Sequence, residues 1–193
     1  MPTPTRTAIR SFLAAYERTL VEGPGLKHAA VLIPLIEHGG SLRVLFTKRT
    51  DQVEHHKGQI SFPGGMAEPQ DADCIATALR ETEEETGIAR SDIEVLGICD
   101  DFRTPTGFRI TPVVGYLASM PQLRIHNVEV DEAFTVPLDF FLDPRNERIE
   151  KREHGKTVLT ISFFDYGEYC IWGATAAILR RFLHAFLERQ ARS

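Results

Sequence analysis

Apolar and polar positions alternate along several short stretches of the chain, and this alternation predicts strands. Residues 28–49 form two β-rich runs that meet at Gly39 and Gly40, so together they predict a hairpin. A short apolar run ends at Phe62, just before a Pro-Gly-Gly turn. Similar patterns predict further strands at 92–99, 108–117, 157–164 and 168–172.

Apolar residues recur with helical spacing in three other places, at residues 6–20, 71–86 and 174–189. Residues 136–144 predict a single helical turn. Strands mixed with helices at both ends and one in the middle favour an α/β fold, an α/β/α sandwich around a mixed sheet. We therefore expect a single domain over residues 1–193, with an N-terminal helix within 1–22 and a C-terminal helix at 173–190 packed on it.

Composition is that of an ordinary globular domain, with 193 residues, 42% hydrophobic and 25% charged. The formal net charge is −5, but it is unevenly placed. Residues 68–85 hold seven acids and one arginine, a net charge of −6, so the rest of the chain carries +1. This concentration indicates a cation site, and no basic stripe suited to nucleic acid is present in the sequence.

The three cysteines, Cys74, Cys99 and Cys170, are far apart and lack the paired spacing of a zinc site or a disulfide framework. The first twenty residues lack the uninterrupted apolar core of a signal peptide, and no later run approaches the length of a membrane span. We therefore expect a cytoplasmic protein without a nucleic-acid or membrane partner. The sequence leaves open whether the chain forms a homodimer.

The stretch Arg80–Gly87 places four glutamates among eight residues near the end of the predicted helix. At about 100° per residue, Glu81, Glu84 and Glu85 share one face, and Glu83 points elsewhere. Carboxylates crowded at a helix C-terminus repel one another and oppose the helix dipole. A divalent cation would relieve that repulsion, and oxygen ligands suit Mg²⁺ or Mn²⁺. The alternative is a solvated acidic face without a ligand.

Residues 64–88, GGMAEPQDADCIATALRETEEETGI, resemble the Nudix box. The positions that match are Gly65, Arg80, Glu81, Glu84, Glu85, Gly87 and Ile88. Five residues separate Gly65 from Asp71, as in the box, but eight residues separate Asp71 from Arg80 where the box has seven. The resemblance implies that Glu81, Glu84 and Glu85 bind metal ions, with the Gly64 carbonyl as a further ligand and Arg80 orienting Glu84.

Upstream, residues 45–68 resemble the additional signature of coenzyme A pyrophosphatases within the Nudix superfamily, although Glu54 replaces its usual basic residue. This resemblance implies metal-dependent hydrolysis of coenzyme A or acyl-coenzyme A to a 4'-phosphopantetheine product and adenosine 3',5'-bisphosphate. Two alternatives remain: another Nudix activity, on ADP-ribose, nucleoside diphosphate sugars or dinucleoside polyphosphates, or a catalytically silent nucleotide-binding module. The expected substrate-binding residues are Lys48, Arg49, His56, Lys57, Gly64 and Gly65.

The general base is not fixed by the sequence. Glu129 and Glu132 lie in a segment that resembles the family's acid-bearing stretch, and Glu129 is the residue we assign to catalysis. The alternative is that these acids lie on a surface loop and have no catalytic role.

Overall fold

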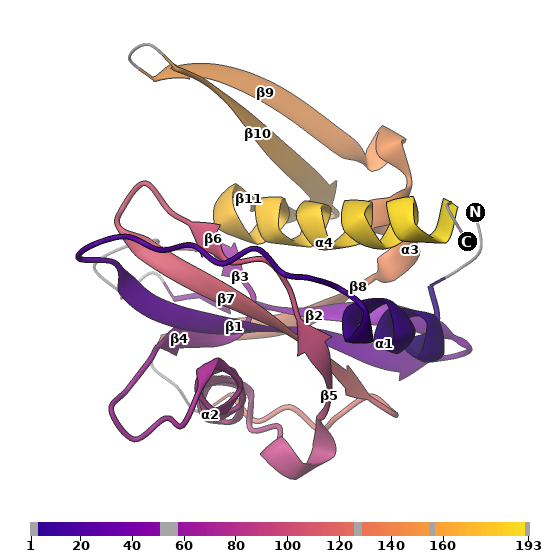
Figure 1. The fold of residues 1–193 in the computed structure, drawn as a ribbon. Helices are drawn as coiled ribbons and strands as arrows, with labels where there is room; N and C mark the ends of the chain where they lie inside the picture. The colour runs from indigo at the N-terminus through magenta and orange to yellow at the C-terminus, as the bar shows by residue number, and fades with distance from the viewer. Residues whose placement is uncertain (1–3, 51–57, 126–128, 155–156, 192–193) are drawn as a thin grey trace.

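A mixed β-sheet lies between one described helix on one face and three on the other (Figure 1). The computed structural model describes residues 4–50, 58–125, 129–154 and 157–191. Its helices are α1 (Arg6–Ala14), α2 (Cys74–Thr86), α3 (Leu138–Leu142) and α4 (Gly173–Ala191), with short 3-10 turns at Arg90–Asp92 and Pro144–Asn146. The α/β fold with a mixed sheet is the one that the sequence predicts.

The main sheet has eight strands, and its central path runs β3-β2-β1-β7-β5. Strand β1 pairs in parallel with β7, whereas its pairing with β2 is antiparallel. Three strands lie off this path, with β4 on β1, β6 on β7 and β8 on β2. The strands are β1 (Lys27–His38), β2 (Ser41–Arg49), β3 (Ile60–Ser61), β4 (Gly64–Met66), β5 (Glu94–Ile98), β6 (Phe102–Arg103), β7 (Phe108–Leu117) and β8 (Val130–Pro137).

The two faces of the sheet bury separate cores because successive side chains of a strand point to opposite sides. Leu32 and Ile36 of β1 pack with Ala78 of α2. Ile33 and Leu35 belong to the other core, which also contains these residues of α1 and α4: Ile9, Phe12, Leu13, Ile178, Leu179, Phe182, Leu183 and Phe186. Helix α2 therefore covers one face of the sheet, together with Ile88 and Ile93 of the segment that follows it.

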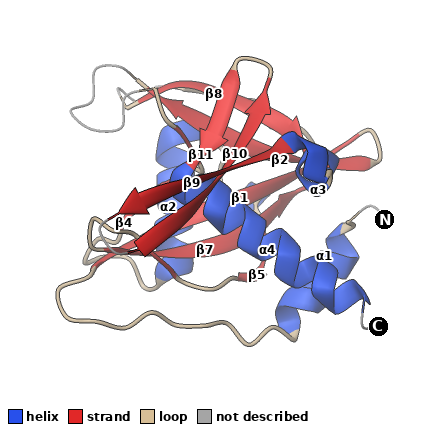
Figure 2. Ribbon diagram, turned by 90° about the horizontal axis from the view of Figure 1, so that it is seen from above, coloured by secondary structure: helices blue, strands red, loops and turns tan. Residues whose placement is uncertain are grey.

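A second sheet of three antiparallel strands has the order β11-β10-β9 and lies beyond α4 (Figures 1 and 2). Phe164 and Ile171 bury its inner face against the α4 core. Arg180 of α4 also binds Glu147 at 2.8 Å. The strands are β9 (Glu147–His154), β10 (Thr157–Tyr166) and β11 (Tyr169–Trp172).

The hairpin predicted at Gly39 and Gly40 is confirmed, and both glycines adopt the positive φ that such a tight turn requires. The helix predicted over 6–20 is too long, because α1 ends at Ala14. The sequence interpretation also missed β8 and β9. Strand β9 is rich in charged residues and has only Ile149 as an apolar position, so it lacks the alternation that reveals a strand.

Candidate active site

Helix α2 carries the acidic stretch, and its two ends are fixed by its own sequence. The Asp73 side chain accepts a hydrogen bond from the Ala76 N–H at 2.8 Å and caps the N-terminus. Gly87 ends the helix with φ of 72°, and its N–H donates to the Glu83 carbonyl at 2.9 Å. These caps set the register of the carboxylates that lie between them.

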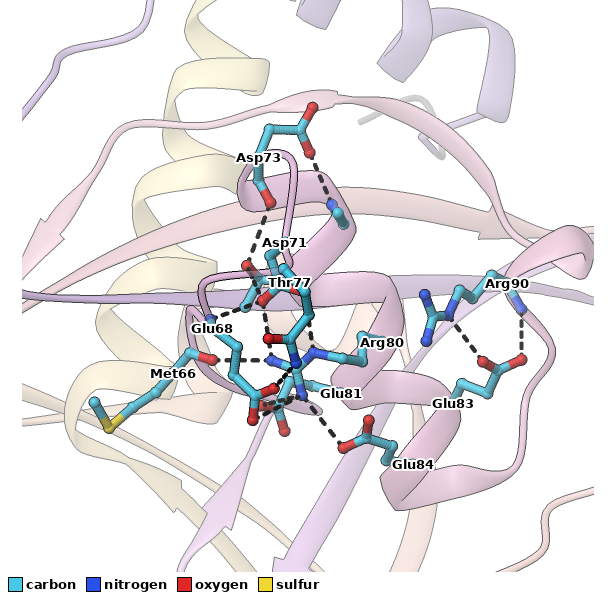
Figure 3. Close-up of polar contacts among 12 residues, drawn as sticks. Met66, Glu68, Asp71, Asp73, Thr77, Arg80, Glu81, Glu83, Glu84 and Arg90 are labelled. Atoms are coloured by element: carbon cyan, nitrogen blue, oxygen red, sulfur yellow. Dashed lines mark hydrogen bonds and ion pairs between the residues drawn. The ribbon is translucent and has the colours of Figure 1, made fainter.

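Arg80 is the centre of a buried polar network, and its side chain is only 8% exposed (Figure 3). Its Nε and Nη2 each donate to a different carboxylate oxygen of Asp71, both at 3.1 Å. Nη2 also donates to the Met66 carbonyl at 3.0 Å. The hydrogen bonds from Arg80 hold the pKa of Asp71 well below its usual range, and Asp71 in turn raises the pKa of Arg80.

Asp71 is fixed from its other side as well. Its Oδ2 accepts hydrogen bonds from the Thr77 hydroxyl and from the Glu68 N–H, both at 2.9 Å. The loop between Asp71 and Arg80 therefore accommodates its additional residue without separating the two groups. Asp71 serves as the buried counterion of Arg80.

The same guanidinium reaches the acidic face of α2. Nη1 of Arg80 lies 3.0 Å from Glu81 and 3.3 Å from Glu84. Glu83, in contrast, pairs with Arg90 at 2.8 Å on another side of the helix, as Figure 3 shows. Arg80 therefore constrains two of the three predicted metal ligands, and Glu83 belongs to a separate surface pair.

Glu85 is the most deeply placed carboxylate of the stretch, with 4% of the residue exposed. The pKa of Glu85 is raised to about 8, chiefly by burial, and the charge on Glu81 contributes to this shift. The Gly64 N–H donates to Glu85 at 3.3 Å and opposes that shift. Within the described residues, Glu85 makes no ion pair, so its charge is poorly compensated.

Two glycines bring the backbone of β4 close to these carboxylates. A Cβ atom at Gly65 would lie 2.5 Å from the Glu81 carboxylate. A Cβ atom at Gly64 would lie 2.4 Å from the Ala30 carbonyl oxygen of the neighbouring strand. Only glycine permits both approaches, so β4 can lie against the neighbouring strand and the Glu81 carboxylate at once.

Arg49 and Glu129 form an ion pair whose charges act on Glu85. Arg49, at the end of β2, binds Glu129 at 2.9 Å. Arg49 lowers the pKa of Glu85 and Glu129 raises it, so both charges act on the buried carboxylate. The structure therefore places a predicted phosphate-binding cation and the predicted general base beside the acidic helix.

Lys48 and Glu132 pair across β2 and β8, one position from Arg49. The register of the β2–β8 pairing shifts between Lys48 and Arg49, so the pairing is irregular at this point. Glu132 accepts a hydrogen bond from the Tyr169 hydroxyl, which raises the pKa of Tyr169 to about 12. These residues connect the main sheet to the second sheet. His56 and Lys57 lie outside the described residues.

The acidic residues of α2 are candidate ligands for a divalent cation. Among the described residues, no three His, Cys, Asp or Glu side chains converge closely enough to enclose a metal ion. The chemistry of the residues still fits one, because Glu81, Glu84 and Glu85 offer only oxygen atoms and burial raises the pKa of Glu81 and of Glu85. A divalent ion would supply the compensating charge that Glu85 lacks.

Sequence reasoning missed two contacts. The Met66 carbonyl binds Arg80, and Tyr169 binds Glu132. Every residue has a backbone carbonyl, so the residue type does not reveal which carbonyl binds Arg80. Tyr169 is distant from Glu132 in the chain, so only the packing of β11 beside β8 could reveal their pairing; its ring stacks on Phe134 with 3.7 Å between centroids.

Comparison with known proteins gives the family. The profile of the NUDIX domain matches residues 26–179, most of the chain. The chain is a Nudix hydrolase. An uncharacterized Nudix hydrolase, NudL, of Pectobacterium atrosepticum is 34% identical over 186 residues, which cover 92% of this chain and 94% of that protein.

Two further Nudix relatives are matched over less of their own length. A mitochondrial Nudix hydrolase of Arabidopsis thaliana, number 15, is 41% identical over 170 residues, which cover 84% of this chain and 60% of the relative. A peroxisomal coenzyme A diphosphatase of Mus musculus is 41% identical over 116 residues, which cover 60% of this chain and 49% of that protein.

The fold is similar to solved Nudix structures. A NUDIX hydrolase from Alicyclobacillus acidocaldarius superimposes with a TM-score of 0.56 at 19% identity, and the match covers 87% of this chain and 96% of that chain. Among the described helices, none is long and apolar enough to cross a membrane. The family profile and the relatives matched in sequence support a hydrolase that acts on pyrophosphate bonds.

Proposed function

We propose that this Nudix hydrolase cleaves the pyrophosphate bond of coenzyme A or an acyl-coenzyme A, giving a 4'-phosphopantetheine product and adenosine 3',5'-bisphosphate. The observation that carries the hydrolase chemistry is the buried carboxylate of Glu85 beside Glu81 and the Gly64 backbone. The signature over residues 45–68 and the 41% identity to a coenzyme A diphosphatase over 116 residues support the substrate.

The metal ligands in this proposal are Glu81, Glu84, Glu85 and the Gly64 carbonyl, and the ion is Mg²⁺ or Mn²⁺. When bound, such an ion would supply Lewis acidity toward the pyrophosphate and would make water a better nucleophile. Arg80 holds Glu81 and Glu84 toward the site by its contacts at 3.0 and 3.3 Å. Asp71 keeps Arg80 itself in place.

In this proposal, positively charged side chains around the site bind the substrate. Arg49 is suited to a pyrophosphate oxygen because its charge acts on Glu85 and because its buried Nε has no hydrogen-bond partner among the residues that the structure describes. Lys48, His56, Lys57, Gly64 and Gly65 complete the substrate-binding set that we infer. Glu129 would take the proton from the attacking water, and Arg49 fixes its carboxylate in the absence of substrate.

A cytoplasmic location belongs to the same proposal. All three cysteines are free, which suits a reducing compartment.

The product distribution tests the substrate. Purified protein is incubated with coenzyme A, acetyl-coenzyme A, ADP-ribose and diadenosine polyphosphates, with and without Mn²⁺, and the products are separated by chromatography. We expect adenosine 3',5'-bisphosphate from coenzyme A only when Mn²⁺ is present. Products from ADP-ribose or dinucleoside polyphosphates alone would reject coenzyme A as substrate. No turnover of any compound, together with nucleotide binding, would indicate a silent binding module.

A further inference from the structure

Strand β9 is the outer strand of the second sheet, whose order is β11-β10-β9 (Figure 1). In the described part of the chain, no strand pairs with its outer edge. Such an edge exposes a row of backbone N–H and C=O groups that another strand can bind. The edge is long for one left unpaired, because β9 runs from Glu147 to His154.

One of the exposed residues in the first half of β9 is apolar. Ile149 is 50% exposed and lies among the charged residues Glu147, Arg148, Glu150, Lys151 and Arg152. Charged side chains on an edge strand usually prevent another strand from pairing. In β9, the order of the charged residues along the strand determines which registers of antiparallel pairing are disfavoured.

Two copies of one strand can pair antiparallel only about a two-fold axis perpendicular to the sheet. Each residue then faces a residue of the second copy that is equally far from the axis, and the two share one face of the sheet. With the axis at Ile149, Arg148 lies opposite Glu150 and Glu147 lies opposite Lys151. Each pairing occurs twice, so the register contains four opposite-charge pairs around one apolar contact.

Every other register within Glu147–Arg152 puts a charged residue opposite its own copy. An axis at Glu150 would also place Arg148 opposite Arg152. Like charges directly opposite each other destabilise a sheet, whereas opposite charges and apolar pairs stabilise it. The charge order therefore selects one register of self-pairing and disfavours its neighbours.

The side chains of this register are already ordered within one copy. Arg148 binds Asp165 at 3.2 Å and also binds Glu150, and its guanidinium lies 4.3 Å from the centroid of the Phe163 ring. Arg152 binds the other oxygen of Glu150 at 2.9 Å. Groups that are fixed before association lose less conformational entropy when they associate.

The geometry points to a symmetric homodimer in which β9 of one copy pairs antiparallel with β9 of a second copy, with the two-fold axis at Ile149. The two three-stranded sheets then form one sheet of six strands. The partner that fits this edge is therefore a second copy of the same chain.

Sedimentation equilibrium tests the proposal, because a single chain has a mass of 21.7 kDa. We expect the mass of the wild-type protein to approach twice that value as concentration rises. Ile149→Asp places two carboxylates on the axis, and Lys151→Glu creates two Glu–Glu contacts, so each should raise the dissociation constant at least about tenfold. Lys151→Arg keeps the charge and is the matched control, with unchanged association.

Unfolding curves and hydrolysis by each variant show whether the fold is retained. If the wild-type protein stays monomeric at every concentration, the proposal is overturned. The outer edge of β9 would then be available to a strand of a different protein. A dimer that survives both Ile149→Asp and Lys151→Glu overturns it as well.

The register is tested by cross-linking in a Cys170→Ser background, since Cys170 is exposed. Ile149→Cys puts two thiols opposite each other, and a short bismaleimide should link them. Lys151→Cys puts its two thiols four residues apart along the strands, on the order of 13 Å, beyond the same reagent. Linkage through Lys151→Cys but not through Ile149→Cys would reject the register, and the parent variant controls for Cys74.

Discussion

Arg80 and Glu85 are both buried on helix α2, yet their surroundings differ in opposite ways. Arg80 contacts Asp71, Glu81, Glu84 and the Met66 carbonyl, so its charge is fully compensated. Within the described residues, Glu85 accepts one hydrogen bond, from the Gly64 N–H, and its pKa rises to about 8. The contacts of Arg80 stabilise the fold, whereas Glu85 makes no direct ion pair among the described residues and is affected by Arg49 only through its charge.

The largest effect should come from removing the charge of Glu85. We expect Glu85→Gln, and likewise Glu84→Gln, to lower turnover with Mn²⁺ by about 10³-fold, since each removes a metal ligand. Glu83→Gln is the matched control and should change turnover little, because Glu83 pairs with Arg90 away from the site. Steady-state kinetics on the three variants measures this, and equal losses would mean that the ligands are wrongly assigned.

Arg80→Leu should lower the free energy of unfolding by about 3–5 kcal/mol, because it leaves the Asp71 carboxylate buried without its partner. Urea denaturation measures the change. Adding Asp71→Asn to Arg80→Leu should recover part of the loss. Arg90→Leu is the control, since it breaks an exposed pair and should cost about 0.5 kcal/mol or less. Similar losses for Arg80→Leu and Arg90→Leu would contradict the role given to Arg80.

Substitutions at the two glycines of β4 should affect stability and turnover to different extents. Gly64→Ala drives a Cβ atom against the Ala30 backbone and should destabilise the protein by about 1–3 kcal/mol. Gly65→Ala meets only the flexible end of Glu81. We expect it to lower turnover about tenfold with a smaller loss of stability. Urea denaturation and kinetics on both variants test this contrast, which fails if the two variants lose stability equally.

The smallest effect concerns pH in metal-free protein. The carboxyl of Glu85 has a folded pKa of about 8, above its unfolded value of 4.5, so the folded state binds the proton more tightly. Its charge therefore lowers stability progressively as pH rises from about 4.5 to 8, and no penalty remains below that range. Glu85→Gln should melt a few degrees above wild type at pH 8 but not at pH 4.5. Mn²⁺ should close the gap at pH 8 in thermal melts, and a gap that is constant with pH would contradict this account.

Much of this architecture could be predicted from the sequence, because the responsible signals are local. The Gly39–Gly40 hairpin, the helix at 71–86 and the separation of Glu83 from the other three glutamates follow from turn chemistry and helical periodicity. The counterion role of Asp71 did not follow, since the loop length had one additional residue and only tertiary structure shows how it is accommodated. Strand β9 was missed because its stability depends on pairing with β10 rather than on an apolar pattern.

The parallel pairing of β1 with β7 affects how the protein folds. Lys27 aligns with Phe108, so the chain between these strands forms one long closed loop that contains α2 and both glycines of β4. Closing a loop of this length is slow compared with forming a hairpin. Until β7 has paired with β1, the core beneath α2 lacks Val113 and Leu117. We therefore expect hydrolytic activity to appear late in folding.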